Sequence, residues 1–448
     1  MSDTTIIWLL GAVLMVVTTV PVVLRLRAKE EQSEAADLEA LRYGLKEPAT
    51  LHPVINPDVC IGIGNCVSVC PEGDVLGIRN GQGFPVMPAR CIGHGLCERV
   101  CPVEAIQLVF GTEKRGVDLP RIQENFETNV PGIYIVGELG GMGLIRNAFE
   151  QGRQCIEGIR SESRATDPEL LDLVIVGCGP AGLSASLNAK AAGLRFETIE
   201  REDLGGTVRH YPRKKLVMTA PVKVPNYGKI GAREMRKEEL IETWERVVAE
   251  AGLVVRTHET VQSVEVREGG GFDVYTTKGL LSANRVVLAI GRRGVPRKLG
   301  VPGEDAPKVM YALREPEAYA GDRILVVGGG DSAVEAAMTL SEQEGTAVHL
   351  SYRREQFSRI KPDNHRKLEK AVAAGRVQTI LGTQVKEIHD ERVILQGADG
   401  SPILLPNDQV FVFAGGELPT PFLTACGIEI EKRFGAPRLP KRSARRSA

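Results

Sequence analysis

Two segments of the chain each combine a short apolar strand, a glycine-rich turn and a helix of small residues. The first reads LDLVIV over 171–176, then GCGPAG, then LSASLNAKAAG. The second reads RILVV over 323–327, then GGGDSAVEAA. Glycines at such a turn let the backbone approach a pyrophosphate, and the helix N-terminus stabilises its negative charge. The two segments therefore predict an α/β chain with two dinucleotide-binding domains.

The residues after the next strand of each unit distinguish the two nucleotides. Glu200 ends the strand RFETIE, about 20 residues beyond the first turn, where an acid binds the ribose hydroxyls. Arg353 and Arg354 follow the strand AVHLSY in the second unit. Guanidinium groups there suit a 2′-phosphate, which favours NADPH over NADH, although a solvated loop would read the same way. The predicted nucleotide-binding residues are Gly177, Gly179, Pro180, Ala181, Gly182 and Glu200 in the first unit, and Gly328, Gly330, Ala333, Arg353 and Arg354 in the second.

An internal repeat carries six of the nine cysteines. Residues 57–71 read PDVCIGIGNCVSVCP and residues 88–102 read PARCIGHGLCERVCP. Each copy has the spacing C-x5-C-x3-C-P. This pattern resembles the bacterial two-cluster ferredoxin pattern C-x2-C-x2-C-x3-C-P, with Ile63 and His94 at the position of the second cysteine. The resemblance implies a small α+β ferredoxin-like domain.

In such ferredoxins the last cysteine of one motif binds the other cluster. The resemblance thus implies one ligand set of Cys60, Cys66 and Cys101, and another of Cys91, Cys97 and Cys70. Each set has three thiolates, and three interpretations stay open. The sets could hold 3Fe–4S clusters, His94 could complete a 4Fe–4S cluster, or the domain could have lost its clusters. The cysteines could instead be buried packing residues or zinc ligands, although their spacing fits zinc poorly. We predict one or two bound iron–sulfur clusters.

The N-terminal segment predicts a membrane anchor. Residues 6–24 carry no charge over a length that can span a bilayer, and Arg25, Arg27 and Lys29 follow at once. The positive-inside rule predicts a single-pass protein of the cytoplasmic (inner) membrane with its soluble domains in the cytoplasm. A cleaved signal peptide is the alternative, but no basic region precedes the apolar segment and no A-x-A site follows it. Residues 28–48 are polar and predict a solvated helical stalk.

The glycine-rich units and two further segments resemble one enzyme family. These segments are VVLAIGRRGVPRKLGVPGED at 286–305 and NDQVFVFAGGELPTPFL at 407–423. Over roughly residues 120 to 434 the chain is similar to the thioredoxin reductase-like pyridine nucleotide-disulfide oxidoreductases, including the bacillithiol-disulfide and ferredoxin–NADP reductases. The resemblance implies FAD at the first glycine-rich turn, NADPH at the second, and an FAD-dependent NAD(P)H oxidoreductase. Its members are often dimers, so a homodimer is possible.

One segment of that family lies out of order. The family closes its flavin domain with a segment like T-x-x-P-G-strand-G-D and a helix, and the residues after 423 do not read this way. Residues 128–155, TNVPGIYIVGELGGMGLIRNAFEQGRQC, do, with Gly137 matching and Glu138 replacing the aspartate. We hypothesise a circular permutation that brings Gly137 and Glu138 to the flavin. A chance Pro-Gly strand in a linker is the alternative.

These assignments divide the chain into eight parts. They are a transmembrane helix at 4–27, a polar helical linker at 28–50, the ferredoxin-like domain at 51–111, the transposed closing segment at 112–165, the FAD domain at 166–294, the NADPH domain at 295–407, a return to the FAD domain at 408–434, and a basic disordered tail at 435–448. The helix at 237–252 is predicted to pack on the core through Trp244. The basic stretches 209–215 and 441–446 are read as solvated surface that could also touch anionic lipid or an acidic partner.

The predicted function is membrane-anchored electron transfer. NADPH gives two electrons as hydride, a cluster takes one, and flavin can do both, so electrons could pass from NADPH to the clusters or the reverse. A ferredoxin, a quinone-linked carrier or another redox protein is the expected partner. A net charge of −1 gives no reason to expect nucleic acid. We predict no catalytic acid–base residue.

Two alternatives remain. One is a disulfide reductase that uses Cys178 or Cys155 beside a vestigial ferredoxin domain. The thioredoxin reductase Cys-x-x-Cys is absent from KVMYALREPEAYAGDR before the second glycine-rich turn, and Cys155, Cys178 and Cys426 are isolated, which favours packing roles. The other alternative is a non-enzymatic redox sensor.

Overall fold

The structure is a computed structural model. It describes residues 3–437 except 44, 47, 49–50, 92, 114–115, 142, 163–165, 212, 214–215, 219–220, 233, 293–294, 358–359 and 418. The chain forms two compact units. One contains residues up to Val117 and the segment that begins at Phe434, and the other contains residues 118–433.

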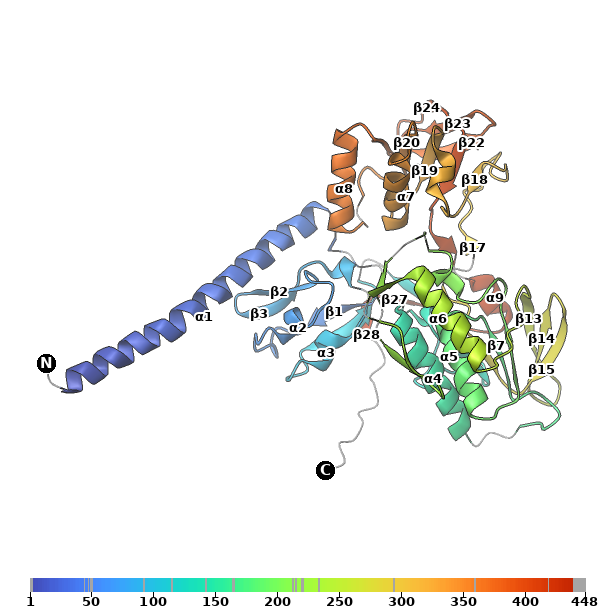
Figure 1. The fold of residues 1–448 in the computed structure, drawn as a ribbon, viewed down its shortest axis with the longest axis horizontal. Helices are drawn as coiled ribbons and strands as arrows, with labels where there is room; N and C mark the ends of the chain where they lie inside the picture. The colour runs from blue at the N-terminus through green and yellow to red at the C-terminus, as the bar shows by residue number, and fades with distance from the viewer. Residues whose placement is uncertain are drawn as a thin grey trace. The chain divides into compact units, whose positions relative to one another are not determined.

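The first unit joins a long helix to a small α+β domain (Figure 1). Helix α1 runs without interruption over Asp3–Arg42. Two antiparallel strands, β1 (Leu51–Ile55) and β4 (Ile106–Phe110), pair along their whole length. Each cysteine repeat contributes one short helix, α2 (Asn65–Ser68) and α3 (Leu96–Arg99). Between them lie the hairpin β2 (Leu76–Arg79) and β3 (Gln82–Pro85) and the turn η1 (Pro88–Arg90).

The second half of α1 is not a solvated stalk, contrary to the prediction for residues 28–50. Ala40 and Leu45 are buried with Val86 and Met87 in one apolar cluster. Ser33 on α1 accepts a hydrogen bond from the backbone N–H of Ile78 on β2. Small and apolar residues at these positions let the helix lie against the hairpin. Many of the polar residues that led to the prediction of a stalk lie on the opposite, exposed face of the helix.

One half of the second unit contains the first glycine-rich turn and is called the flavin half after its predicted cofactor. It is built on a parallel sheet in the order β6-β16-β7-β8. Its strands are β6 (Ile133–Ile135), β16 (Val286–Leu288), β7 (Leu173–Val176) and β8 (Phe196–Ile199). Helices α4 (Ile145–Ser161) and α5 (Pro180–Ala191) pack on each other. Helix α6 (Lys237–Glu250) packs through Trp244, which is buried as predicted. The antiparallel sheet β13 (Val261–Val266), β14 (Phe272–Thr276) and β15 (Gly279–Ala283) adds to the same half.

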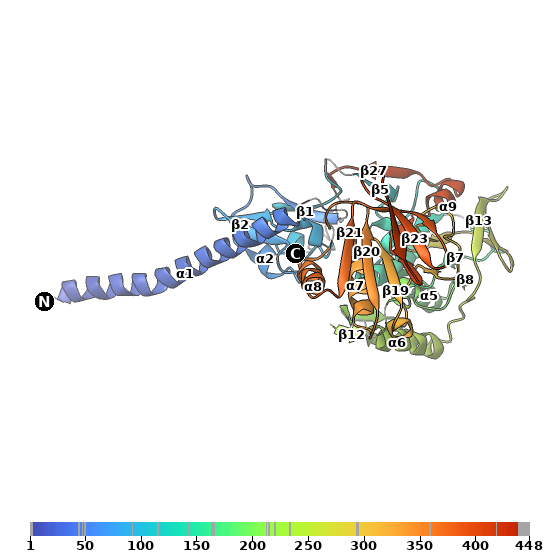
Figure 2. The same ribbon diagram turned by 90° about the horizontal axis from the view of Figure 1, so that it is seen from above.

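The second nucleotide-binding half has the sheet order β18-β25-β19-β20-β21. Figure 2 shows β19 (Arg323–Val327), β20 (Ala347–Tyr352) and β21 (Val377–Leu381) side by side, with α7 (Asp331–Ser341) and α8 (Pro362–Ala373) on one face. Strands β18 (Val309–Met310) and β25 (Gln409–Val412) complete the sheet. A second antiparallel sheet follows, formed by β22 (Gln384–Ile388), β23 (Arg392–Gln396) and β24 (Pro402–Pro406).

Short elements connect these parts. They are β5 (Val117–Pro120), η2 (Glu138–Gly140), η3 (Gly206–Val208), β9 (Leu216–Met218), β10 (Val222–Val224), β11 (Gly228–Ile230), β12 (Glu234–Arg236), β17 (Val295–Pro296), η4 (Pro316–Tyr319), β26 (Gly416–Glu417), α9 (Thr420–Ala425), β27 (Ile430–Arg433) and β28 (Ala436–Pro437).

Two predicted boundaries are wrong. The sequence predicts a return to the flavin domain at 408, but Gln409–Val412 pairs with β19 inside the second nucleotide sheet. The return comes later, where Leu423 of α9 joins the flavin core. The sequence also predicts a disordered tail from 435, but Ala436–Pro437 pairs with β4 of the first unit. Residues 438–448, including the basic stretch 441–446, lie outside the described residues, as do 212, 214 and 215 of the other basic stretch.

Candidate functional site

One large pocket with about 1650 Å³ of empty space lies in the flavin half. The first glycine-rich turn lines it through Gly177, Gly179, Pro180 and Ala181, and Glu200 lines it from the end of β8. All the residues predicted for this nucleotide except Gly182 therefore line a single cavity.

The turn needs glycine for two separate reasons. Gly177 has φ +96°, in the left-handed region where a side chain is strained. A Cβ on Gly182 would lie 1.8 Å from the carbonyl oxygen of Gly177, so only glycine lets α5 start this close to β7. The first turn of α5 thus points its backbone N–H groups at the cavity.

Glu200 is fixed by backbone donors. Its carboxylate accepts hydrogen bonds from the N–H of Cys178 at 2.6 Å and from the N–H of Glu202 at 3.0 Å. The side chain is largely buried and still reaches the cavity. This position is where an acid can bind ribose hydroxyls.

The segment 128–155 lies beside the same turn. Strand β6 pairs in parallel with β16, and Gly137 and Glu138 line the large pocket. A Cβ on Gly137 would be 3.0 Å from the Cβ of Ala181, and the Gly137 N–H donates to Gln151 of α4 at 2.7 Å. Gly137 and Glu138, which precede the glycine-rich turn in the sequence, therefore meet the 177–182 turn at one cavity.

Helix α4 approaches α5 at a glycine. A Cβ on Gly152 would lie 2.3 Å from the carbonyl oxygen of Ala181 and 2.9 Å from the backbone nitrogen of Ala185. Ser184 of α5 also donates to the carbonyl oxygen of Phe149 at 2.6 Å. Helix α4, which follows β6, is thus docked on the helix of the glycine-rich turn.

The second glycine-rich turn, like the first, contains a glycine that the neighbouring backbone approaches too closely for a side chain. A Cβ on Gly328 would lie 2.5 Å from the carbonyl oxygen of Phe413 and 2.9 Å from the Cβ of Ala333, and α7 begins directly after Gly330. Arg353 and Arg354 follow the last residue of β20, and both are exposed. The structure thus places two cations after the strand where the sequence predicts them.

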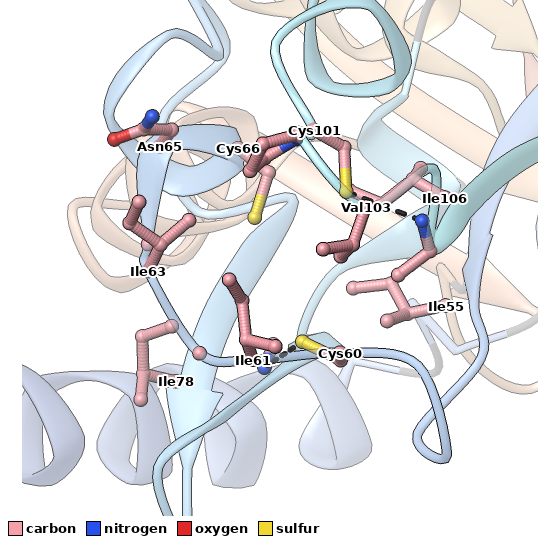
Figure 3. Close-up of a pocket in the computed structure, with 15 residues that line it drawn as sticks. Ile55, Cys60, Ile61, Ile63, Asn65, Cys66, Ile78, Cys101, Val103 and Ile106 are labelled. Carbon is pink, nitrogen blue, oxygen red and sulfur yellow. Dashed lines mark hydrogen bonds between the residues drawn. The ribbon is translucent and has the colours of Figure 1, made fainter.

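The first cysteine set converges on a small pocket with about 360 Å³ of empty space. Figure 3 shows the sulfur atoms of Cys60, Cys66 and Cys101 facing this space. The N–H of Gly83 donates to the Cys60 sulfur at 3.4 Å, and that of Ala105 donates to the Cys101 sulfur at 3.2 Å. Backbone donors to sulfur suit anionic thiolates, and soft thiolates are the donors that iron–sulfur clusters need.

The second set is also brought together. Burial raises the pKa of the Cys97 thiol to about 11, and the neighbouring Cys70 adds to this effect. Burial raises the pKa of the Cys91 thiol to about 12, with further contributions from Cys97 and Cys70. Cys101 of the second motif thus lines the pocket of the first set, and Cys70 of the first motif is close enough to Cys91 and Cys97 to affect both thiols.

Different residues occupy the position of the missing fourth thiolate in the two sets. Ile63 lines the first pocket and is 58% exposed, and its hydrocarbon side chain cannot bind iron. His94, half-buried, occupies the equivalent position of the second repeat. The flanking glycines 62, 64, 93 and 95 all have positive φ, so both loops curl in the same way. Among the described residues no three His, Cys, Asp or Glu side chains gather closely enough for a single metal ion.

The remaining three cysteines are packed in the core. Cys155 and Cys178 are completely buried, and burial raises the pKa of both thiols far above the ordinary value. Cys178 belongs to the apolar cluster of Trp244, and its side chain does not line the large pocket. Cys426 packs in the flavin core.

Sequence reasoning missed several residues that line the large pocket. Thr207, His210 and Tyr211 come from the loop after β8, Thr260 precedes β13, and Phe422 comes from α9. The loop belongs to the stretch read as basic surface. Phe422 lies in the segment LPTPFL, which carried the family resemblance and was the available signal.

Comparison with known proteins decides the family. The family model described as pyridine nucleotide-disulphide oxidoreductase matches residues 174–443. The chain belongs to this family. As a member of this family it is an FAD-dependent NAD(P)H oxidoreductase. The match confirms the family resemblance that the two glycine-rich turns indicated. A 4Fe–4S dicluster domain model matches residues 53–108, which confirms the ferredoxin-type character of the cysteine repeat.

Individual relatives agree with this assignment. The ferredoxin–NADP reductase of Ignicoccus hospitalis is 34% identical over 254 residues, which are 55% of this chain and 78% of that protein. The bacilliredoxin reductase Bdr of Bacillus subtilis is 30% identical over 268 residues, 59% of this chain and 82% of that protein. Among solved structures, bacillithiol disulfide reductase Bdr (YpdA) from Bacillus cereus gives a TM-score of 0.54 at 28% identity, covering 60% of this chain and 85% of that one.

Proposed function

We propose that this protein is an NADPH-dependent flavin and iron–sulfur oxidoreductase that transfers electrons between NADPH and a ferredoxin-type or other redox partner. The convergence of Cys60, Cys66 and Cys101, which come from both cysteine motifs, on one pocket is the observation that carries the proposal. The cysteine sets could hold iron–sulfur clusters, which transfer one electron at a time, and the two nucleotide-binding sheets could hold FAD and NADPH, which take part in two-electron transfer. When bound, FAD supplies the chemistry that links hydride transfer to one-electron transfer.

The residues of the large pocket fit a dinucleotide such as FAD. The α5 N-terminus would hold the pyrophosphate and Glu200 would hold the ribose, while Gly137 and Glu138 would lie along the remaining length of the cofactor. Arg292, whose pKa is lowered by burial, has the carboxylate of Glu138 as a compensating charge.

The second glycine-rich turn would hold NADPH. Gly328, Gly330 and Ala333 would leave room for the pyrophosphate, and Arg353 and Arg354 would bind the 2′-phosphate. Both arginines are exposed, so a phosphate can reach them.

The first cysteine set would hold a 3Fe–4S cluster. Its three thiols match a three-thiolate cluster, and Ile63 offers no fourth donor. The second set has His94 at the equivalent position, and a 4Fe–4S cluster with an imidazole ligand is our assignment there.

We also propose that the flavin domain is circularly permuted. The pairing of β6 with β16 and the docking of α4 on α5 support this proposal, because β6 and α4 precede the glycine-rich turn in the sequence yet pack with the sheet and the helix that flank this turn.

Residues of α1 would anchor the protein in the cytoplasmic membrane, with the two units in the cytoplasm. The helix is long and apolar enough to cross a bilayer, with a mean hydropathy of 1.8 over its best window and no burial there. A signal sequence has the same properties, and Arg25, Arg27 and Lys29 favour the anchor.

A disulfide reductase, the activity named for the solved relative from Bacillus cereus, fits the structure less well. Cys178 and Cys155 are fully buried and lie in different apolar clusters, so they offer no exposed thiol to a substrate.

Cofactor analysis of two serine variants tests the proposal. The protein purified without oxygen should contain FAD, iron and acid-labile sulfide. Cys66→Ser should lose the signal of one cluster and Cys97→Ser that of the other, because each thiol belongs to a different set. The proposal fails if the purified protein contains no iron, or if either variant abolishes both clusters while the FAD content is unchanged.

A further inference from the structure

The first unit exposes apolar side chains beside its first cysteine set. Val59, Ile61 and Ile63 are 41%, 64% and 58% exposed, and they surround the loop that begins at Cys60. At the position of Ile63 the second repeat carries the polar His94. Ile61 and Ile63 also line the pocket of the first cysteine set, and Val59 lies outside it. The outward sides of the three β-branched side chains form an apolar patch on one short loop. We call these three residues the isoleucine patch.

Contacts with α1 fix where this patch lies along the helix. The N–H of Gly81, at the tip of the β2–β3 hairpin, donates to the carboxylate of Glu30 at 2.9 Å. The N–H of Ile78 donates to Ser33, one turn further along. At the other end of the hairpin, Val86 and Met87 pack with Ala40 and Leu45. The hairpin therefore runs along α1 with its tip toward the apolar end of the helix.

The loop of the isoleucine patch rests on that tip. A Cβ on Gly62 would lie 1.7 Å from the carbonyl oxygen of Gly81, so the two backbones are in direct contact. Gln82 also donates its side-chain amide to the carbonyl oxygen of Pro57 at 2.8 Å. Leu24, the last residue of the uncharged segment, is six residues before Glu30, or about 9 Å along a helix axis. The first set thus lies at the end of the domain nearest the apolar segment of α1.

We propose that the isoleucine patch contacts the surface of the lipid bilayer and holds the first cysteine set against the membrane. This inference rests on the proposal that α1 spans a membrane. Arg25, Arg27 and Lys29 would lie at the level of anionic headgroups, and the patch would enter the layer just below them. The turn η1, which directly precedes Cys91 of the second set, is hydrogen-bonded to Leu45 beyond the end of α1, so the second set would face the aqueous side. A set held at the membrane faces carriers dissolved in the bilayer, such as the quinone-linked partner that the sequence leaves open.

Tryptophan quenching by brominated phospholipids tests this proposal on the full-length protein. The protein is reconstituted into vesicles of phosphatidylethanolamine and phosphatidylglycerol, with or without bromine on the acyl chains close to the headgroups. Ile61→Trp places a reporter in the patch. Leu41→Trp is the matched control, since Leu41 is equally exposed, at 60%, but lies on α1 far from the apolar segment. Trp8, within the apolar segment, reports insertion of α1, and its contribution is obtained by comparison with a Trp8→Phe protein. The other native tryptophan, Trp244, is buried and supplies the background emission that is subtracted in every sample.

The proposal predicts that bromine quenches more than half of the emission of Trp at position 61 and leaves that at position 41 unchanged. The inference is overturned if Trp8 is quenched while the reporter at 61 behaves like the one at 41, because the patch would then face water, another protein or a second copy. Failure of Trp8 to be quenched would instead refute the membrane anchor, and this inference with it.

Discussion

The residue with the clearest chemical consequence is Ile63. Its side chain lines the pocket of Cys60, Cys66 and Cys101 at the place where a two-cluster ferredoxin has a thiolate. An iron atom at that corner would have no protein ligand. The first set therefore differs from a four-thiolate site by one atom of sulfur.

Ile63→Cys should convert the three-iron cluster that we propose for the first set into a four-iron cluster. The new thiolate supplies the missing ligand, so the iron content should rise and the electron paramagnetic resonance signal of the oxidised protein should be lost. An oxidised three-iron cluster is paramagnetic, whereas the usual oxidised four-iron cluster is not. Ile61→Cys is the control, because it lines the same pocket at a position that is not a ligand in the motif. An unchanged signal in the first variant would argue against the three-iron assignment.

Cys155 and Cys178 should resist alkylation in the native protein. Both are fully buried and burial raises the pKa of both thiols, so little reactive thiolate is present at pH 8. Mass spectrometry after brief treatment with N-ethylmaleimide should find neither modified, and unfolding in denaturant should expose both. Rapid native modification of Cys178 would favour the disulfide reductase alternative.

Among the elements, the contact between helices α4 and α5 attaches the segment 128–155 to the glycine-rich turn. Their closest approach is at Gly152, where a methyl group would overlap the backbone of α5. Gly158 lies on the same helix with nothing within 4 Å of its Cβ position. The two glycines allow the packing effect to be separated from helix propensity.

Gly152→Ala should lower the free energy of unfolding by about 1–3 kcal/mol, because it forces the helices apart. Gly158→Ala should raise it by about 0.5–1 kcal/mol, since alanine favours the helix and meets no neighbour. Denaturant titration measures both values, and FAD retention should fall only in the first variant. Equal effects at the two positions would show that α4 is not docked on α5 as described.

Asp408 ties the start of β19 to the strand β25. It accepts hydrogen bonds from the guanidinium of Arg323 at 2.6 and 2.9 Å, and these hold the pKa of its carboxyl at about 2. A carboxyl with a lowered pKa in the folded state stabilises the fold above its unfolded pKa, about 3.9, and this stabilisation is lost as pH falls toward 2.

Asp408→Asn should therefore be less stable than the natural protein at pH 7, and the difference between the two should shrink below about pH 4. Urea midpoints measured from pH 7 down to pH 3 give this comparison. A difference that stays constant over the whole range would mean that the charge of Asp408 contributes nothing.

At the scale of the whole molecule, the sequence predicts the domains better than their boundaries. The glycine-rich turns and the cysteine repeat depend on local spacing, and each is found where the sequence predicts it. The sequence places the strand 409–412 in the wrong domain, because a buried apolar strand has the same pattern in either parallel sheet. Only its pairing with β19 shows that it belongs to the second nucleotide-binding sheet. The polar segment of α1 reads as a stalk because Ser33 and Ala40 lack apolar bulk, although they are small enough to fit the hairpin.

In the candidate site, too, residues of local motifs can be predicted and residues placed by tertiary contacts cannot. Glu200 and the turn at 177–182 follow from a motif, whereas His210 and Tyr211 reach the pocket through a loop whose path no local pattern encodes. The segment 128–155 can be found in the sequence because it matches a family pattern, and its Gly137 lies against Ala181 of the glycine-rich turn.

The central claim is that electrons pass between NADPH and the cysteine-held clusters within this one chain. Anaerobic mixing with NADPH, followed by visible absorption and by paramagnetic resonance of rapidly frozen samples, tests it most directly. The account predicts that the flavin absorption bleaches and that the paramagnetic signal of the first cluster then disappears without any added protein. Bleached flavin beside a cluster signal that persists under excess NADPH would contradict it.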